Sequence, residues 1–317
     1  MMPAVLALSG ALVYGAADFF GGLAAKSLRS IVVTAVAALS GLLALLIAQP
    51  FVGGEWTAGD IGWGVLAGGF GALAIALLYA CLAIGPMSIL SPLTAVVSAI
   101  APMLWGLLVD GEELSALAYA GLGVALVAVV LVGFIPGEKV VRPSIRGLLM
   151  AIGAGLAIGG FLIAIDQTSD DSGLVPLVLS RSTTVVVTGV AIGMLAIGAV
   201  RRRTGAASIL RPAAGLGVTP SGHADLEHAT PSHPSPAPTV ARAWWLAVTC
   251  GIVDAAANAL ALLALRGGDL SIVSALTALY PAGTILLAAV VLRERVAAVQ
   301  WAGLALALVA GGLLAIG

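Results

Sequence analysis

Charged residues are scarce in this chain. Only 9% of its 317 residues are Asp, Glu, Lys or Arg, whereas 61% are hydrophobic; soluble domains carry about 25% charged and about 45–50% apolar residues. A soluble globule has no interior large enough to hide so much apolar surface, so the solvent for most of the chain must be lipid. The formal net charge of −1 lacks the basic footprint of a nucleic-acid-binding protein.

Residues that carry catalysis or bind metals are also few. The two cysteines, Cys81 and Cys250, fall in apolar runs, so the sequence indicates no disulfide framework. His223, His228 and His233 recur every five residues, a spacing that fits no helix face, and no cysteine joins them. Because the chain also lacks a nucleophile–base pair and a nucleotide-binding fingerprint, we expect no enzymatic activity, no metal site and no cofactor.

Long apolar runs dominate the remainder. A helix that crosses a bilayer needs roughly 17–25 mostly apolar residues, and these runs lack the period-two alternation of a membrane β-barrel. The six tryptophans fall near the ends of the runs, as interfacial rings do. The sequence therefore predicts an all-α integral membrane protein with ten transmembrane helices, at residues 4–23, 31–48, 61–84, 87–109, 115–135, 145–165, 174–200, 244–265, 270–292 and 296–316.

Basic residues are concentrated in the odd-numbered loops between these spans. These loops hold most of the 14 Lys and Arg residues, including Lys26 and Arg29 after the first span and residues 201–203 after the seventh. Loops rich in Lys and Arg stay on the cytoplasmic side of a membrane. We therefore expect a multi-pass protein of the cytoplasmic membrane, with the basic odd-numbered loops in the cytoplasm and both termini outside.

The two halves of the chain resemble each other. The segment LAIGPMSILSPLTA (82–95) aligns without gaps to LRGGDLSIVSALTA (265–278), at an offset of 183 residues, with eight identities that include Ser, Thr and Gly. Each half has five spans, an odd number, so the second half must insert upside down; the charges of corresponding loops also change sign. The sequence predicts two inverted five-helix repeats, over 4–135 and 145–316, the architecture of alternating-access carriers.

Residues 201–243 interrupt the second repeat. This segment is rich in Pro, Ser, Ala and Gly and lacks apolar periodicity. We expect it to be a disordered cytoplasmic loop.

Several motifs add a family resemblance. The stretch LSIVSALTALYPAGTILLAAVVLRERVAAVQWAG (270–303), the GE or RE pair before the last span of each half, and YGAADFFGGLAAK (14–26) are similar to the EamA family of the drug/metabolite transporter superfamily. This resemblance implies a multi-pass carrier of small metabolites, often an exporter. It implies no particular solute, because the family's motifs are mostly structural.

Asp254 and Asn258 stand in an otherwise apolar run, GIVDAAANAL (251–260). An ionisable residue at the centre of a membrane helix costs roughly 2.5–3.5 kcal/mol on insertion scales, so it normally faces a cavity or a partner. The two residues share one helix face, and their counterparts at the offset of 183, Gly71 and Ile75, are not polar. Two interpretations remain: a solute- or proton-binding site at mid-membrane, or polar contacts between helices.

Asp18 and Arg181 are the other ionisable residues within predicted spans. Asp18 is a second candidate for binding solute or protons; the alternative is an interfacial carboxylate or an ion pair with Lys26. Arg181 would attract an anionic solute, but the acidic segment 166–171 lies near the same face. We therefore expect a structural salt bridge between Arg181 and that segment.

Hydroxyl side chains recur at matching positions of the two halves, next to Pro92 and near Pro281. Interrupted segments in corresponding positions point to the binding region of a carrier, whereas small residues also permit close helix packing. The candidates for lining a cavity are Ser91, Thr94, Ser274 and Thr277, together with Tyr79 and Tyr280. Glu112 and Glu294, which precede the last span of each half, are expected to cap the helix that follows them through its dipole.

The combined interpretation is a secondary-active carrier. Its halves would rock around a cavity lined by spans one, three, four, six, eight and nine, exporting an amino acid, an amine or a drug-like solute. Because no ATP-binding motif is present, a gradient must supply the energy, and protons taken up by Asp254 or Asp18 are the expected coupling ion. The alternatives are an importer of sugars or other small solutes, and a non-transporting multi-pass membrane protein. The expected partners are the solute, protons and the lipid bilayer, without nucleic acid, in a monomer or a homodimer.

Overall fold

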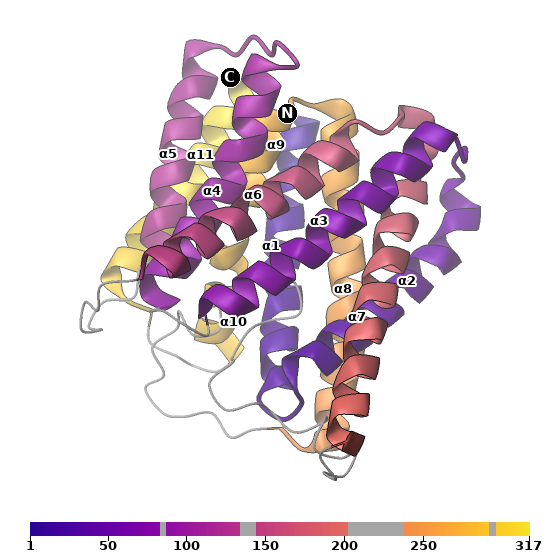
Figure 1. The fold of residues 1–317 in the computed structure, drawn as a ribbon. Coiled ribbons are helices and arrows are strands. Elements are labelled where there is room, and N and C mark those ends of the chain that lie inside the picture. Colours follow the sequence, from indigo (N-terminus) through magenta and orange to yellow (C-terminus); the bar gives the residue numbers. More distant parts are fainter. Residues whose placement is uncertain (83–86, 134–143, 202–237, 292–295) are drawn as a thin grey trace.

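The chain folds as a bundle of long helices (Figure 1). The structure, a computed structural model, describes residues 1–82, 87–133, 144–201, 238–291 and 296–317. The described elements are α1 (Met2–Ala25), α2 (Ser30–Val52), α3 (Ala58–Leu82), α4 (Met87–Leu108), α5 (Ala116–Gly133), α6 (Ile145–Asp166), the 3₁₀ turn η1 (Asp170–Ser172), α7 (Val175–Arg201), α8 (Val240–Gly267), α9 (Leu270–Thr277), α10 (Tyr280–Val291) and α11 (Ala298–Ile316).

The expected all-α membrane fold is confirmed. Within the described ranges, nine helical segments are long and apolar enough to cross a membrane, and a shorter apolar segment, Leu93–Leu108, lies within α4. These ten segments fall at the ten predicted spans. The helices on either side of the predicted loop 201–243 extend into it: α7 includes Arg201 and α8 already begins at Val240, so the loop is shorter at both ends. Its remainder, 202–237, lies outside the described residues.

The ninth span is broken, whereas its counterpart in the first half is not. The helix stops at Thr277 and restarts as α10 at Tyr280, and Pro281 has no backbone N–H to continue the ladder to Thr277. By contrast, α4 runs without a break through Pro92. The two prolines do not occupy equivalent positions, since Pro92 corresponds to Ala275 and Pro281 to Ser98 at the offset of 183, and only Pro281 lies at a helix break.

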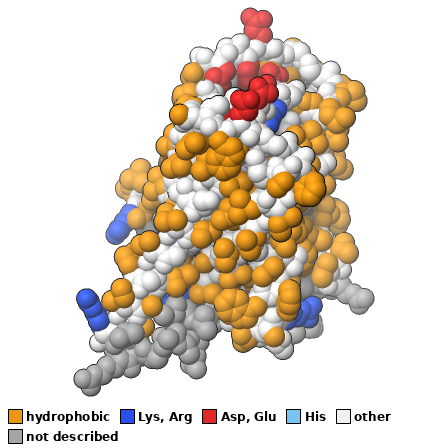
Figure 2. Space-filling model, turned by 90° about the vertical axis from the view of Figure 1, so that its right-hand side faces the viewer, with side chains coloured by type: hydrophobic (Ala, Val, Ile, Leu, Met, Phe, Trp, Pro, Cys, Tyr) orange, Lys and Arg blue, Asp and Glu red, His pale blue; other side chains and the backbone are white. Residues whose placement is uncertain are grey.

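Charge separates the two ends of the bundle. Figure 2 shows the Asp and Glu side chains gathered at one end, with mostly Lys and Arg toward the other and an apolar flank between them. The loops α2–α3, α4–α5 and α6–α7 carry Glu55, Asp110 and Asp170, and the opposite loops carry Lys26 and Arg29. We call these the acidic end and the basic end.

Small residues let the helices approach closely, as is usual where lipid removes the hydrophobic drive between helices. A Cβ on Gly251 of α8 would lie 2.0 Å from the carbonyl oxygen of Ala37 in α2. One group of helices consists of α1, α2, α8, α9 and α10, with α1 packed along α8 and α10, and α2 along α8. We call this the α1 group. The α6 group consists of α3, α4, α6 and α7, with α6 packed along α3 and α4, and α3 along α7.

The remaining helices, α5 and α11, pack mainly on each other and lie side by side at one flank of the bundle (Figure 1). The two groups meet where α2 touches α7 and α4 touches α9. Each group therefore contains helices from both halves of the sequence.

Candidate functional site

A cavity lies between the α1 group and the α6 group. It offers about 120 Å³ to water-sized molecules, room for several waters or one small solute, since a single water needs roughly 10–15 Å³ by the same measure. Its wall is mostly apolar on the side of α3 and α6. The side chains that bring polar atoms or sulfur to it are Tyr14, Thr34, Ser98, Ser180, Arg181, Thr184, Cys250, Asp254, Asn258, Ser274, Thr277 and Tyr280.

An ion pair spans this cavity. The guanidinium of Arg181, on α7, donates from Nη2 to Oδ2 of Asp254, on α8. The Arg181 side chain is 19% exposed and that of Asp254 7%, so the pair is largely withdrawn from solvent. The expectation that Arg181 pairs with the acidic segment 166–171 was wrong, because α7 turns this side chain toward α8 in the interior.

Asn258 completes the polar cluster. Its Nδ2 donates to the backbone oxygen of Asp254 at 2.8 Å and reaches Oδ2 of the same residue at 3.3 Å. Both residues are buried and both line the cavity, as the i, i+4 spacing predicted. Together with Arg181, they place a carboxylate, an amide and a guanidinium on one part of the cavity wall, between α7 and α8.

Three more predicted residues lie at the cavity, close to the break between α9 and α10. Ser274 donates to the backbone oxygen of Ser271 at 3.1 Å, and Tyr280 is buried. The hydroxyl of Thr277 is buried and has no hydrogen-bond partner among the described residues. Thr277 therefore offers a donor and an acceptor to whatever occupies the cavity.

Four predicted residues are not placed at the cavity. Thr94 donates to the backbone oxygens of Leu90 at 2.9 Å and Ala151 at 3.1 Å, so it joins α4 to α6. Asp18 is fully buried on α1, one turn after Tyr14, but it is not part of the lining. The side chains of Tyr79 and Ser91 lie outside the described residues.

Two helices that line the cavity were not among the six spans expected to do so. Helices α2 and α7 contribute Thr34, Ser180 and Thr184, although only six other spans were expected to line it. Ser180 and Thr184 are four residues apart, and Thr184 lies three residues after Arg181, so polar side chains recur at helical spacing on α7. A polar stripe on α7 was therefore the signal that could have identified this wall.

Glu112 does not cap the helix that follows it. Its carboxylate accepts from the backbone N–H of Ser271 at 3.2 Å, and from the Ser271 hydroxyl. It therefore caps the first turn of α9, which belongs to the other half of the chain, and the expectation for Glu112 was wrong. The corresponding expectation for Glu294 falls outside the described residues.

Comparisons with known proteins agree with this architecture. Twenty-four chains of solved structures match; one of them, described as "Crystal structure of protein", superposes with a TM-score of 0.69 over 99% of this chain and 98% of its own, at 15% identity. At that identity the likeness shows the fold alone. No match was found among curated proteins. The model of the EamA-like transporter family matches residues 231–316, so the family resemblance expected from the sequence is confirmed for the part of the chain that contains α8 to α11.

Proposed function

We propose that this chain is a secondary carrier that moves a small solute across a membrane by alternating access. The observation that carries the proposal is the Arg181–Asp254 ion pair, which joins two groups of helices across a buried cavity. Charged side chains within a membrane mark substrate or ion pathways. The match to a transporter family supports the same class of function and argues against an enzyme.

Two inverted repeats, 4–135 and 145–316, are part of this proposal. The packing supports them: α1 lies along α8 as α6 lies along α3, with the halves exchanged. A Cβ on Gly121 would meet Leu313 and Leu314, and one on Gly303 would meet Leu131 and Val132. The two contacts are equivalent: Gly303 lies 182 residues after Gly121, and Leu313 and Leu314 lie 182 residues after Leu131 and Val132. Such symmetry places a carrier's site where the repeats meet.

The same symmetry indicates which residues of the first half correspond to the charged residues of the cavity. Gly68 packs on Ser180 and Thr183 of α7, and its counterpart Gly251 packs on Ala37 and Ser40 of α2. Residues of α2 therefore correspond to residues of α7 that lie 143 positions later in the chain. On that offset Ala38 corresponds to Arg181.

The equivalent wall of the cavity has no charged cluster. Ala38, Gly71 and Ile75, the counterparts of Arg181, Asp254 and Asn258, all line the cavity as well. One of two equivalent walls thus carries every charge that touches the described cavity. The scaffold needs none of the three polar residues, which supports a role in solute recognition.

The chemistry of the cluster favours a zwitterionic solute such as an amino acid. A solute with only an amine would bind Asp254 and leave the Arg181 guanidinium without its partner; a solute with only a carboxylate would do the reverse. A solute that carries both groups satisfies both side chains while it separates them. The hydroxyls of Thr277 and Ser274 would hold its remaining polar atoms.

The family resemblance suggests the direction of transport, and the buried carboxylates suggest how transport is coupled to protons. Export is the direction that the resemblance implies. Protonation of Asp254 would release Arg181 and free it for a carboxylate, which makes Asp254 the first candidate for proton coupling; the buried Asp18 is the second. Import of a sugar remains the alternative, supported by the hydroxyls that line the cavity.

The solute class can be tested by ligand-dependent thermal stability. We expect threonine or leucine at saturating concentration to raise the Tm of the purified protein more than ethanolamine, propionate or glucose, since a ligand at 100 times its Kd stabilises by about 2.7 kcal/mol. Counterflow of the radiolabelled amino acid in proteoliposomes then measures transport. A response to glucose alone would favour the sugar alternative, and no binding or counterflow of any of the five would favour a non-transporting protein.

Membrane orientation can be tested with single cysteines in a Cys81→Ser, Cys250→Ser background. Glu113→Cys places an exposed thiol at the acidic end and Arg201→Cys one at the basic end. We expect a membrane-impermeant maleimide to label Glu113→Cys in intact cells, and Arg201→Cys only after permeabilisation, because basic loops are retained in the cytoplasm. The reverse pattern would show that the basic end faces outward.

A further inference from the structure

The cavity separates the α1 group from the α6 group, and both groups mix the two halves of the sequence. Asp254 and Thr277 face the cavity from the α1 group, and Arg181 and Ser98 from the α6 group. If the proposed alternating access holds, on which this inference rests, opening the cavity requires these two groups to part. The halves of the sequence, each split between the groups, are not the units that move.

One tie between the groups lies at the acidic end. The Glu112 carboxylate, on the loop that follows α4, accepts both the N–H and the hydroxyl of Ser271 at the start of α9. The fold makes room for this contact: a Cβ on Gly106 of α4 would lie 2.6 Å from the carboxylate. The loop returns through Gly111 at φ +72°, and the Glu112 N–H donates to the Gly106 oxygen at 3.0 Å.

A second tie lies at the same end. Nη2 of Arg266, at the end of α8, donates to Oγ of Ser172 at 2.8 Å and to the backbone oxygen of Gly173 at 2.9 Å. The loop that receives Arg266 is fixed to the α6 group, because Asp60 of α3 accepts from the N–H and the hydroxyl of Ser169 at 2.7 and 2.8 Å. Arg266 therefore fastens the α1 group to an anchored part of the α6 group.

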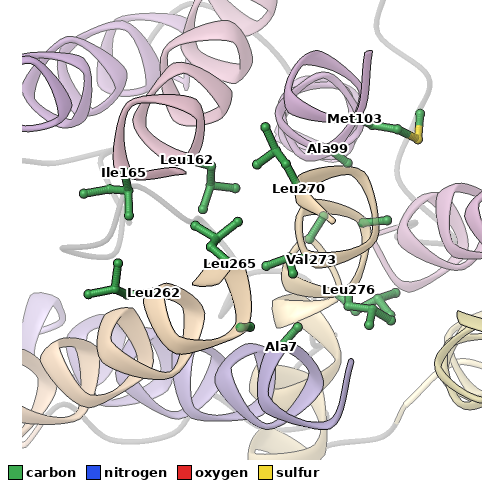
Figure 3. Close-up of a cluster of buried hydrophobic side chains, with 14 of the residues drawn as sticks. Ala7, Ala99, Met103, Leu162, Ile165, Leu262, Leu265, Leu270, Val273 and Leu276 are labelled. Carbon is green, nitrogen blue, oxygen red and sulfur yellow. The ribbon is translucent and has the colours of Figure 1, made fainter. Parts of the chain in front are cut away.

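An apolar layer lies between these ties and the cavity. Figure 3 shows Leu162 and Ile165 of α6 opposite Leu262 and Leu265 of α8, and all four belong to one buried cluster. This layer crosses the boundary between the groups and buries apolar side chains of both. At the basic end, in the part of the chain that the structure describes, the Ser27 hydroxyl donates to the Pro238 oxygen at 2.6 Å and joins two segments of the α1 group to each other.

We propose that Glu112 and Arg266 form a gate that holds the two helix groups together at the acidic end and closes the cavity to that side. Both side chains act by positioning: neither touches the cavity. Breaking either tie removes a hydrogen bond to a charged group, and such bonds are the stronger ones in proteins. The population in which the cavity opens to the acidic end rises as a result.

The native Cys250 reports the opening, because its buried side chain lines the cavity. In a Cys81→Ser background it is the only thiol of the chain. A membrane-impermeant charged maleimide is added to one face at a time, with right-side-out and inside-out vesicles. We expect Glu112→Gln, and separately Arg266→Gln, to raise the labelling rate from the acidic face roughly tenfold, without a rise from the basic face.

Glu113→Gln is the matched control: it removes the neighbouring, exposed carboxylate of the same loop and should leave both rates unchanged. If Glu112→Gln does not fold, Ser271→Ala weakens the same tie with a smaller change. An unchanged rate from the acidic face in folded variants, or an equal rise from both faces, overturns the proposal. The measurement requires no solute, so a protein that transports nothing can still show the gate, and a transporting protein can still fail to show it.

Discussion

Asp254→Asn is expected to reduce transport about a hundredfold, because a hydrogen bond to a charged group is worth about 1.5–3 kcal/mol, and to lower the Tm of the purified protein. The substitution leaves the Arg181 guanidinium buried beside a neutral amide, and breaking a buried ion pair by removing one partner costs about 3–5 kcal/mol. Arg181→Gln should have the same two effects, because it leaves the Asp254 carboxylate buried without its positively charged partner. Thermal unfolding in detergent and counterflow in proteoliposomes measure the two consequences separately.

The double variant Arg181→Gln, Asp254→Asn separates folding from function. The double variant leaves no uncompensated buried charge, which is the source of the loss in each single variant, so the Tm should return toward that of the unmodified protein. Transport should not return, because neither charge is left to bind the solute. If the double variant recovers both Tm and transport, the pair only holds helices together and the proposed recognition role is wrong.

Gly251→Ala is expected to destabilise the fold at the contact between α2 and α8. The new Cβ would lie 2.0 Å from the Ala37 carbonyl oxygen and 2.2 Å from Oγ of Ser40. The first of these atoms belongs to a helix backbone, so α2 and α8 would have to move apart, and the bond from the Ser40 hydroxyl to the Val248 oxygen, 3.1 Å long, would stretch. Overpacking of this kind typically costs about 1–3 kcal/mol, visible as a lower Tm.

Gly69→Ala is the matched control on α3, because a Cβ there meets nothing within 4 Å. Alanine is favoured over glycine inside a helix by about 1 kcal/mol, so this variant should be unchanged or slightly more stable. An equal loss of Tm in both variants would mean that helix content, and not the α2–α8 contact, determines stability.

The spans could be predicted from the sequence because spanning a bilayer is a local property. About twenty consecutive apolar residues suffice to identify a membrane helix, and the alignment of 82–95 with 265–278 pointed to the two helices that carry Thr94 and Thr277. The i, i+4 spacing likewise placed Asn258 beside Asp254 correctly. Each of these inferences needs only residues that are close along the chain or an internal alignment.

Contacts between helices that are distant along the chain could not be predicted from the sequence in the same way. The partner of Arg181 depends on how α7 is rotated relative to α8, and no periodicity encodes that rotation. The position of Glu112 suggested a cap on the next helix, α5, yet its carboxylate reaches α9 because the loop turns back over Gly106. The different fates of Thr94 and Thr277, which occupy equivalent positions, arise from the break that only α9 and α10 have.

The mixing of the two halves within each helix group also constrains how the protein is made. The main packing partner of α1 is α8, which begins at Val240, whereas α1 ends at Ala25. At about 5–20 residues per second, a ribosome needs roughly 10–40 s to synthesise the intervening chain. During that interval α1 is inserted but still lacks the surface it packs against, so its Gly- and Ala-lined face must be covered by lipid or by a membrane chaperone until α8 arrives.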